Sequence, residues 1–196
     1  MNPWMEVDKE ILEGCTRGRA SAQRRLFDLY SHLMLGVCNR YASCIEEAED
    51  IMQEGFVKIF LHIKEFKGDG SLVAWMRRIM INTAITHYYR TRKHRYHGDL
   101  EEVKESRFED TGWEEAEFTR EELFGIIQRM PDGYRMVFNL YAVEGYKHRE
   151  IAEILGIDEN TSKSQYSRAR GWLQERLIKL KKSEMREHGK TGTGDG

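Results

Sequence analysis

Lysine, arginine, glutamine and serine side chains gather on one side of a predicted helix over residues 159–181. Side chains of these types donate hydrogen bonds to phosphate oxygens and to the edges of bases. The other side of the same helix carries apolar or small residues at spacings of four, three and four, namely Ser162, Tyr166, Ala169 and Leu173. This stripe predicts that one face packs inward while the basic face points outward. The chemistry expected here is recognition of a nucleic acid.

A shorter helix is expected just before it, from Lys147 to Leu155. Gly156 can supply the left-handed residue that ends this helix, and Asp158 is a natural N-cap for the next one. The segment GYKHREIAEILGIDENTSKSQYSRARGWL therefore predicts a helix-turn-helix, with Ile151, Ala152, Ile154 and Leu155 buried. The alternative is a helical hairpin in an ordinary bundle. The glycine corner and the one-sided basic face favour DNA binding.

Six residues of this unit are candidate contacts to duplex DNA. Arg168 is the candidate for a base contact, because arginine donates two hydrogen bonds to guanine. Lys163 and Ser164 lie near the helix N-terminus, which usually enters the major groove. Arg149 and Thr161 are the candidate phosphate contacts, and Ser167 is a further candidate on the basic face. The alternative for Arg168 is an ordinary solvent-exposed arginine.

Charge is sorted along the chain although the net charge is only -2. Residues 75–97 hold six Arg or Lys and no Asp or Glu, and residues 160–182 hold seven against one Glu. Between them, residues 99–122 hold eleven acidic residues against three basic ones. Two cationic segments separated by an acidic one suggest two contacts with one polyanion. The alternative is a set of ordinary solvated helix faces.

The hydrophobic spacing predicts an all-α protein of two small helical domains. Helices are expected over residues 22–42, 45–66 and 72–92 in the first half, and over 118–129, 134–143, 147–155 and 159–181 in the second. Glycine and aspartate predict a loop at residues 67–71. We therefore expect a first domain over 1–97, an acidic linker over 98–117, a second domain over 118–183, and a disordered tail over 184–196.

The sequence resembles the RNA polymerase sigma-70 family, and in particular its bacterial extracytoplasmic-function (ECF) group. Three stretches carry the resemblance, in the family's order: DIMQEGFVKIF at 50–60, FKGDGSLVAWMRRIMINTA at 66–84, and GYKHREIAEILGIDENTSKSQYSRAR at 145–170. They look like the polymerase-binding helix, the segment that melts and reads the −10 element, and the helix-turn-helix that reads the −35 element. The resemblance implies a transcription initiation factor that directs core RNA polymerase to promoters.

The first stretch implies a face that binds core RNA polymerase. Asp50, Gln53 and Glu54 fall at i, i+3 and i+4, so they share one side of a helix. The resemblance assigns these three residues and Phe56 to the coiled coil of the β′ clamp, and the second domain to the β flap. An anti-sigma factor, often bound to a membrane, is a further partner that the resemblance implies.

The second stretch implies a site for unpaired promoter DNA. Holding one base outside the stack needs polar groups, apolar walls and cations, which a glycine-containing loop over a basic helix could supply. The resemblance assigns this role to the loop and Asn82, with Lys67, Asp69, Ser71, Arg77, Asn82 and Arg90 as −10 contacts. Trp75 lies in the apolar stripe of its helix, so core packing is favoured over base stacking.

Two residues depart from the family pattern in the helix-turn-helix. Ser162 stands where the family often has an aliphatic residue, and Tyr166 stands where it often has leucine. We therefore expect the packing of this helix to differ locally. Tyr166 could present its hydroxyl toward the DNA.

Composition narrows the remaining alternatives. The sequence has no apolar run of transmembrane length and no secretory signal, and three cysteines without CxxC spacing predict neither a disulfide framework nor a zinc site. These features favour a cytoplasmic protein without metal or cofactor. A helical enzyme is disfavoured because no nucleophile–base pair or phosphate-binding motif is present, and no small-molecule substrate is expected. The main alternative is a helix-turn-helix regulator that acts without polymerase.

Overall fold

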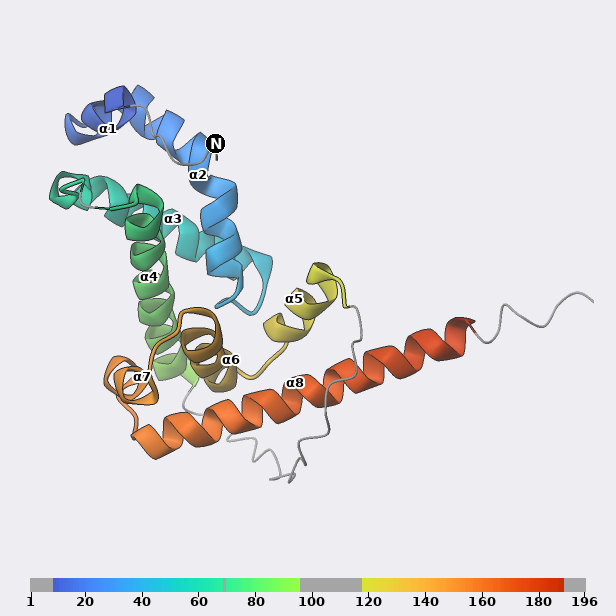
Figure 1. Ribbon diagram of the computed structural model, residues 1–196. Helices are drawn as coiled ribbons and strands as arrows, with labels where there is room; N and C mark the ends of the chain where they lie inside the picture. The colour runs from blue at the N-terminus through green and yellow to red at the C-terminus, as the bar shows by residue number, and fades with distance from the viewer. Residues whose placement is uncertain (1–8, 69, 96–117, 189–196) are drawn as a thin grey trace, which may run out of the picture. The chain divides into compact units, whose positions relative to one another are not determined.

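The computed structural model describes residues 9–68, 70–95 and 118–188 (Figure 1). The described part of the chain is all-helical, with α-helices α1–α8, a 3₁₀ turn and a π-helical turn, and it contains no β-strand. The chain divides into two compact units, residues 1–99 and 100–196. Among the described residues, none of the helices combines the length and the hydropathy that a membrane crossing requires.

The first unit is built from α1 (Lys9–Thr16), α2 (Ala20–Asn39), α3 (Ile45–His62) and α4 (Leu72–Arg95). Helix α2 packs on both α3 and α4, and α3 packs on α4. The core contains Leu26, Ile51, Ile59 and Met76 from the predicted apolar stripes, together with Met34 and Met80. Leu29 and Leu33 also fit the predicted apolar spacing over residues 22–42, but both are exposed. Glu46 and Glu47 stand in the first turn of α3, where negative charge suits the helix dipole.

Helix α1 is an element that the sequence analysis did not predict. Ile11 and Cys15 are its buried apolar residues, and the helix packs on α2 and on the 3₁₀ turn Ile63–Glu65. Gly14 allows this close approach, because a Cβ at that position would lie 2.5 Å from the Cβ of Ala22. Eight residues with only two apolar anchors give too weak a periodic signal to be recognised from sequence.

The short connection between α3 and α4 contains two glycines in backbone conformations that other residues rarely adopt. The 3₁₀ turn Ile63–Glu65 extends α3, and Gly68 and Gly70 then adopt positive φ angles of 82° and 115°. Ser71 precedes α4, and its backbone carbonyl accepts a hydrogen bond from the N–H of Trp75 at 3.1 Å. The loop is thereby fixed at both ends to helices of the core.

The second unit contains α5 (Arg120–Gln128), α6 (Asp132–Phe138), the π-helical turn Asn139–Val143, α7 (His148–Leu155) and α8 (Glu159–His188). Thr119 and Glu122 form a capping box at the start of α5. Arg135 is buried at the corner between α5 and α6, where its guanidinium donates to the carbonyls of Gln128 and Met130 and to Asp132. This bonding satisfies a charge that would otherwise be costly to bury.

Helix α8 is longer than the predicted helix. It continues to His188, so residues 184–188, which were expected to belong to a disordered tail, are helical instead. The predicted linker over 98–117 and the last eight residues of the predicted tail, 189–196, lie outside the described residues.

Candidate functional site

The corner between α7 and α8 has the geometry of a helix-turn-helix. Gly156 ends α7 in the left-handed conformation, with φ 53° and ψ 40°, as the sequence predicted. The N–H of Ile157 then donates to the carbonyl of Ala152 at 3.1 Å. Ile151 and Leu155 on α7 and Ser162 and Ala169 on α8 are buried at the corner. Ala152 and Ile154 were also expected to be buried, but they are only half-buried because they flank the inward stripe of this short helix.

An aromatic cluster lies behind this corner and was not predicted. Tyr166 on α8 contacts Tyr141, with ring centroids 4.4 Å apart, and stacks on Phe138 at 6.2 Å. His148 stacks on Tyr141 with ring centroids 4.3 Å apart and 13° between the planes. The ring of Tyr166 therefore packs toward α6 and the π-helical turn, which accounts for an aromatic residue where the family often has leucine.

His148 explains the second departure from the family pattern. The side chain of Ser162 is fully buried, and its Oγ lies 3.0 Å from Nδ1 of His148, so the hydroxyl has a polar partner inside the corner. Partial burial lowers the pKa of His148, and the neighbouring Lys163 lowers it further, against an opposing effect of Glu159. The neutral imidazole is therefore the form that suits this packing.

The outward face of α8 begins with the side chains predicted to meet DNA. Lys163, Ser164, Ser167 and Arg168 are exposed there, whereas Thr161 is half-buried. Lys163 forms an ion pair with Glu159 one turn earlier, with Nζ and Oε1 2.7 Å apart, and this hydrogen bond lowers the pKa of Glu159. Arg149 on α7 is exposed and lies 3.6 Å from Glu153. An exposed ion pair of this kind contributes little to stability.

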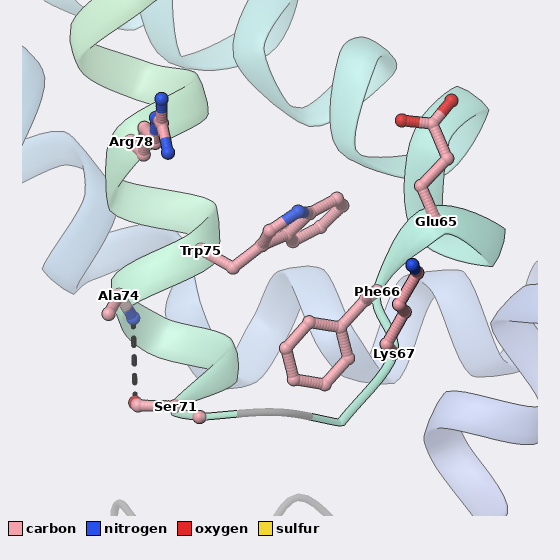
Figure 2. A pocket seen from close by; sticks show the side chains of 8 residues that line it. Glu65, Phe66, Lys67, Ser71, Ala74, Trp75 and Arg78 are labelled. Atoms are coloured by element: carbon pink, nitrogen blue, oxygen red, sulfur yellow. Dashed lines mark hydrogen bonds between the residues drawn. The ribbon is translucent and has the colours of Figure 1, made fainter.

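A pocket of about 480 Å³ opens where the 67–71 loop meets α4. Figure 2 shows the indole of Trp75 reaching from α4 toward the ring of Phe66, which lies between the loop and the helix. The two ring centroids are 5.7 Å apart at an interplanar angle of 48°. The described residues that line the pocket are Glu65, Phe66, Lys67, Gly70, Ser71, Ala74, Trp75 and Arg78. Apolar ring faces, two cations and one carboxylate thus share one open cavity.

The pocket changes the interpretation of several predicted residues. Trp75 was expected in the core, but its side chain is half-buried, packs on Phe66 and lines the pocket. Lys67 and Ser71, two of the residues predicted to contact the −10 element, line the pocket. Asp69, a third, lies outside the described residues. Asn82 is exposed on α4 and is not a lining residue; it follows Arg78 by four residues and so continues the same helix face.

Two pocket residues were not singled out from the sequence. Phe66 and Glu65 come from the end of the 3₁₀ turn and complete the wall opposite α4. The available signal was an aromatic residue, Phe66, directly before a glycine-containing loop.

The acidic end of α3 presents Asp50 and Gln53 to solvent, and Glu54 is half-buried beside them. Phe56 was expected to contact a partner together with these residues, but the structure corrects this expectation. Its side chain is 2% exposed and packs on Phe27, with ring centroids 4.7 Å apart. Phe56 points to the core because it lies on the inward stripe of α3 with Met52 and Ile59.

Glu54 is held between two cations. Nζ of Lys58 lies 2.9 Å from one carboxylate oxygen, and Arg90 on α4 donates to the other. Partial burial raises the pKa of Glu54, but the hydrogen bonds from Lys58 and Arg90 together outweigh this effect, so the pKa is lowered. Arg90, predicted to line the DNA path, is thus bonded to a residue of the predicted polymerase-binding face. The side chain of Arg77 is half-buried on the same helix.

Comparison with protein families matches both units. The family model described as Sigma-70 region 2 matches residues 26–94, and the model described as Sigma-70, region 4 matches residues 120–173. The chain belongs to the sigma-70 family. The first match contains α3 and the pocket, and the second contains the α7–α8 corner.

Curated relatives place this sigma factor in the ECF group. It is 29% identical over 189 residues to the RNA polymerase sigma-H factor of Pseudomonas aeruginosa. This alignment covers 89% of this chain and 96% of that protein. It is 26% identical over 174 residues to the ECF RNA polymerase sigma-E factor of Escherichia coli, covering 84% of this chain and 91% of that protein. The chain is an ECF sigma factor, a non-catalytic initiation factor that binds RNA polymerase and directs transcription initiation.

Solved structures with some similarity include RpoE from Bartonella quintana in complex with the anti-sigma factor NepR. That match has 22% sequence identity and a TM-score of 0.47, and it covers 79% of this chain and 96% of that chain. Another is CnrH in complex with the cytosolic domain of CnrY, with 18% identity and a TM-score of 0.43, covering 88% and 98% of the two chains.

Proposed function

We propose that this sigma factor holds one unpaired base of the −10 element in the pocket formed by Phe66, Lys67, Trp75 and Arg78. The observation that carries the proposal is the open cavity with two aromatic rings on its walls and two cations at its edge. A base stacked on an aromatic side chain gains about 1–3 kcal/mol. That gain offsets much of the cost of taking the base out of the duplex stack.

Each kind of pocket side chain would make a different kind of contact with the DNA strand. The faces of Phe66 and Trp75 receive a base by stacking, whichever base it is, because every base has a π-face. Lys67 and Arg78 neutralise the flanking phosphates, and the carboxylate of Glu65 accepts hydrogen bonds from exocyclic amino groups. We propose that Asn82 and Arg77 on α4 contact the same strand beyond the pocket, while Ser71 contacts it from the pocket wall. Asp69 stays a predicted contact from the sequence.

We assign the −35 element to the outward face of α8. Arg168 and Ser164 are exposed on a face opposite the buried Ser162 and Ala169, so they can enter the major groove without disturbing the corner. Lys163 and Ser167 flank them on the same outward surface, while Arg149 on α7 and Thr161 reach phosphates. These contacts fix the second unit on duplex DNA while the first unit engages the melted strand.

The exposed side of α3 is the surface that we assign to the polymerase. Asp50 and Gln53 lie on it, and Glu54 borders it, so the surface suits a partner helix rich in arginine. The β′ clamp coiled coil is that partner, with the β flap as a second contact for the second unit. Phe56 supports this helix from the core side.

Two units joined by an acidic segment gain from effective concentration when both bind one promoter. We propose a first domain over residues 1–97, a linker over 98–117 and a second domain from residue 118 to the end of α8 at His188, acting in the cytoplasm where core polymerase resides. Control by an anti-sigma factor stays a prediction from the sequence resemblance.

The proposal is tested by open-complex formation with purified core RNA polymerase on the DNA upstream of the protein's own gene. Trp75→Ala and Lys67→Gln should reduce run-off transcript and reactivity of unpaired thymines, while polymerase binding in gel filtration stays unchanged. Lys64→Gln is the matched control, since Lys64 is exposed three residues away but does not line the pocket. Equal activity of Lys67→Gln, Trp75→Ala and wild type would refute the pocket's role.

A further inference from the structure

The outward face of α8 does not end where the family match ends. The match stops at residue 173, but α8 runs on to His188 as one helix, without a break in its bounds. Residues 11 and 14 positions apart lie on the same side of an α-helix, as do those 4 and 7 apart. Lys179 and Lys182 therefore share a face with Ser164 and Arg168. Both lysines are exposed.

We infer that Lys179 and Lys182 form a second DNA site on α8, which binds the sugar-phosphate backbone of the duplex next to the −35 element. The inference rests on the proposed reading of that element by α8. It adds a contact to the DNA backbone that lies outside the helix-turn-helix.

The buried side of α8 fixes which way these lysines point. Ser162, Ala169 and Leu177 are buried against the rest of the second unit, at spacings of seven and eight residues. The face opposite this stripe carries Arg168 near the groove-reading end and Lys179 further along, with 60% of the Lys179 side chain exposed. A duplex held by the first turns of α8 therefore meets Lys179 and Lys182 from the same side.

Distance along the helix decides what the two lysines can reach. An α-helix rises ~1.5 Å per residue, so they lie roughly 17 and 21 Å beyond Arg168 along the axis. The major groove is about 12 Å wide. A helix that reads bases at residues 163–168 has therefore left the groove at 179–182 and passes over its wall, where phosphates are the available ligands. The far end of a recognition helix contacts the backbone in the same way in homeodomains.

One acidic residue opposes the site and provides a test of opposite sign. Glu175 shares the face and forms an ion pair with Lys179, and it also lies 3.9 Å from Arg176. An approaching phosphate must displace this carboxylate from Lys179. Removing the carboxylate should therefore strengthen DNA binding.

The chain also offers a matched control of equal charge. Arg176 and Lys181 belong to the same stretch of α8 but point to other sides, and Arg176 lies over the ring of Trp172 at 4.9 Å from its centroid. If net charge alone sets the affinity for DNA, removing either pair of cations should weaken binding equally. If this face of α8 contacts the DNA, only the loss of Lys179 and Lys182 should weaken binding.

The experiment measures binding of the polymerase holoenzyme to a duplex from upstream of the protein's own gene, between 50 and 200 mM salt. Each phosphate contact contributes ~0.9 to the slope of log affinity against log salt concentration, so two contacts account for about a tenfold loss over this range. Lys179→Gln with Lys182→Gln should remove that share of the slope, Glu175→Gln should raise affinity, and Arg176→Gln with Lys181→Gln should leave the slope unchanged.

Equal slopes for the two double variants, or no change in either, would overturn the inference. Failure of the proposed −35 reading gives a different result, because Arg168→Ala would then leave the preference for the promoter duplex over a scrambled duplex intact. Circular dichroism of each variant checks that α8 is retained; glutamine is as good a helix former as lysine, so the helix should persist.

Discussion

Arg90 on α4 is hydrogen-bonded to Glu54 on α3, and Lys58 holds the other oxygen of the same carboxylate. A cation predicted to line the DNA path is therefore bonded to a residue predicted to face the polymerase. The two helices pack directly on each other, so the pair needs no other segment to form. Docking of Glu54 onto an arginine-rich helix would compete with Arg90 and release it toward DNA.

The Glu54–Arg90 pair predicts that Glu54→Gln strengthens binding of single-stranded DNA by the free chain. A partly exposed ion pair is worth roughly 0.5–1 kcal/mol, which corresponds to a roughly twofold to fivefold gain in affinity. Fluorescence anisotropy with a labelled oligonucleotide measures it. Glu49→Gln on the same helix removes the same charge, and an equal gain there would mean that net charge alone is responsible. Glu54→Gln should also weaken binding to core polymerase.

Two helical glycines should respond to alanine in opposite ways. At Gly14 a new Cβ would lie 2.5 Å from the Cβ of Ala22, so α1 must move away from α2, at a cost of about 1–3 kcal/mol. At Gly36 nothing lies within 4 Å, so alanine should stabilise α2 by roughly 0.5–1 kcal/mol. Urea unfolding followed by circular dichroism measures both. If Gly14→Ala left the free energy of unfolding unchanged, α1 could not pack on α2 as described.

The second unit should lose stability in mild acid through His148. Burial and Lys163 lower the pKa of His148 in the fold, so the unfolded chain binds the proton more tightly than the folded chain does. Its contribution is fully present at a pH above the unfolded pKa of about 6.5, and it decreases as the pH falls through 6.5 toward the lowered value. Thermal unfolding at pH 7.5 and pH 5.5 measures the difference.

His148→Gln should flatten this dependence between pH 7.5 and 5.5, because glutamine does not titrate. His32→Gln serves as the control, since His32 is an exposed residue of α2 in the other unit. If both variants keep the wild-type slope, the acid sensitivity has another source.

Arg168 should set one base preference in the −35 element. Arg168→Ala is expected to cost ~1–3 kcal/mol in promoter binding and to relax selectivity at a single position. Competition binding with duplexes that vary one base pair at a time identifies that position. A uniform loss over all duplexes would make Arg168 a phosphate contact instead.

Much of this fold is encoded locally and was predictable. The inward stripe of α3 and the Gly156 corner follow from residue spacing and backbone preference, which act within one helix or one turn. On α2 the same spacing also included Leu29 and Leu33, which the structure leaves exposed. The three family motifs could be recognised for the same reason, because each lies within one or two consecutive elements. Helix α1 was not predicted because its two buried apolar residues, Ile11 and Cys15, are too few to establish a periodic pattern.

The sequence by itself determined most of the helices, the apolar side of α3, the Gly156 corner, and that basic residues gather in two separate stretches of the chain. Only the tertiary structure decided that Trp75 opens onto a pocket with Phe66, that Phe56 is buried against Phe27, and that Arg90 is bonded to Glu54. Helical periodicity gives the direction in which a side chain points around the axis of its helix. Whether a neighbouring helix covers that direction depends on crossing angles and helix ends, which are set by packing between segments far apart in the chain.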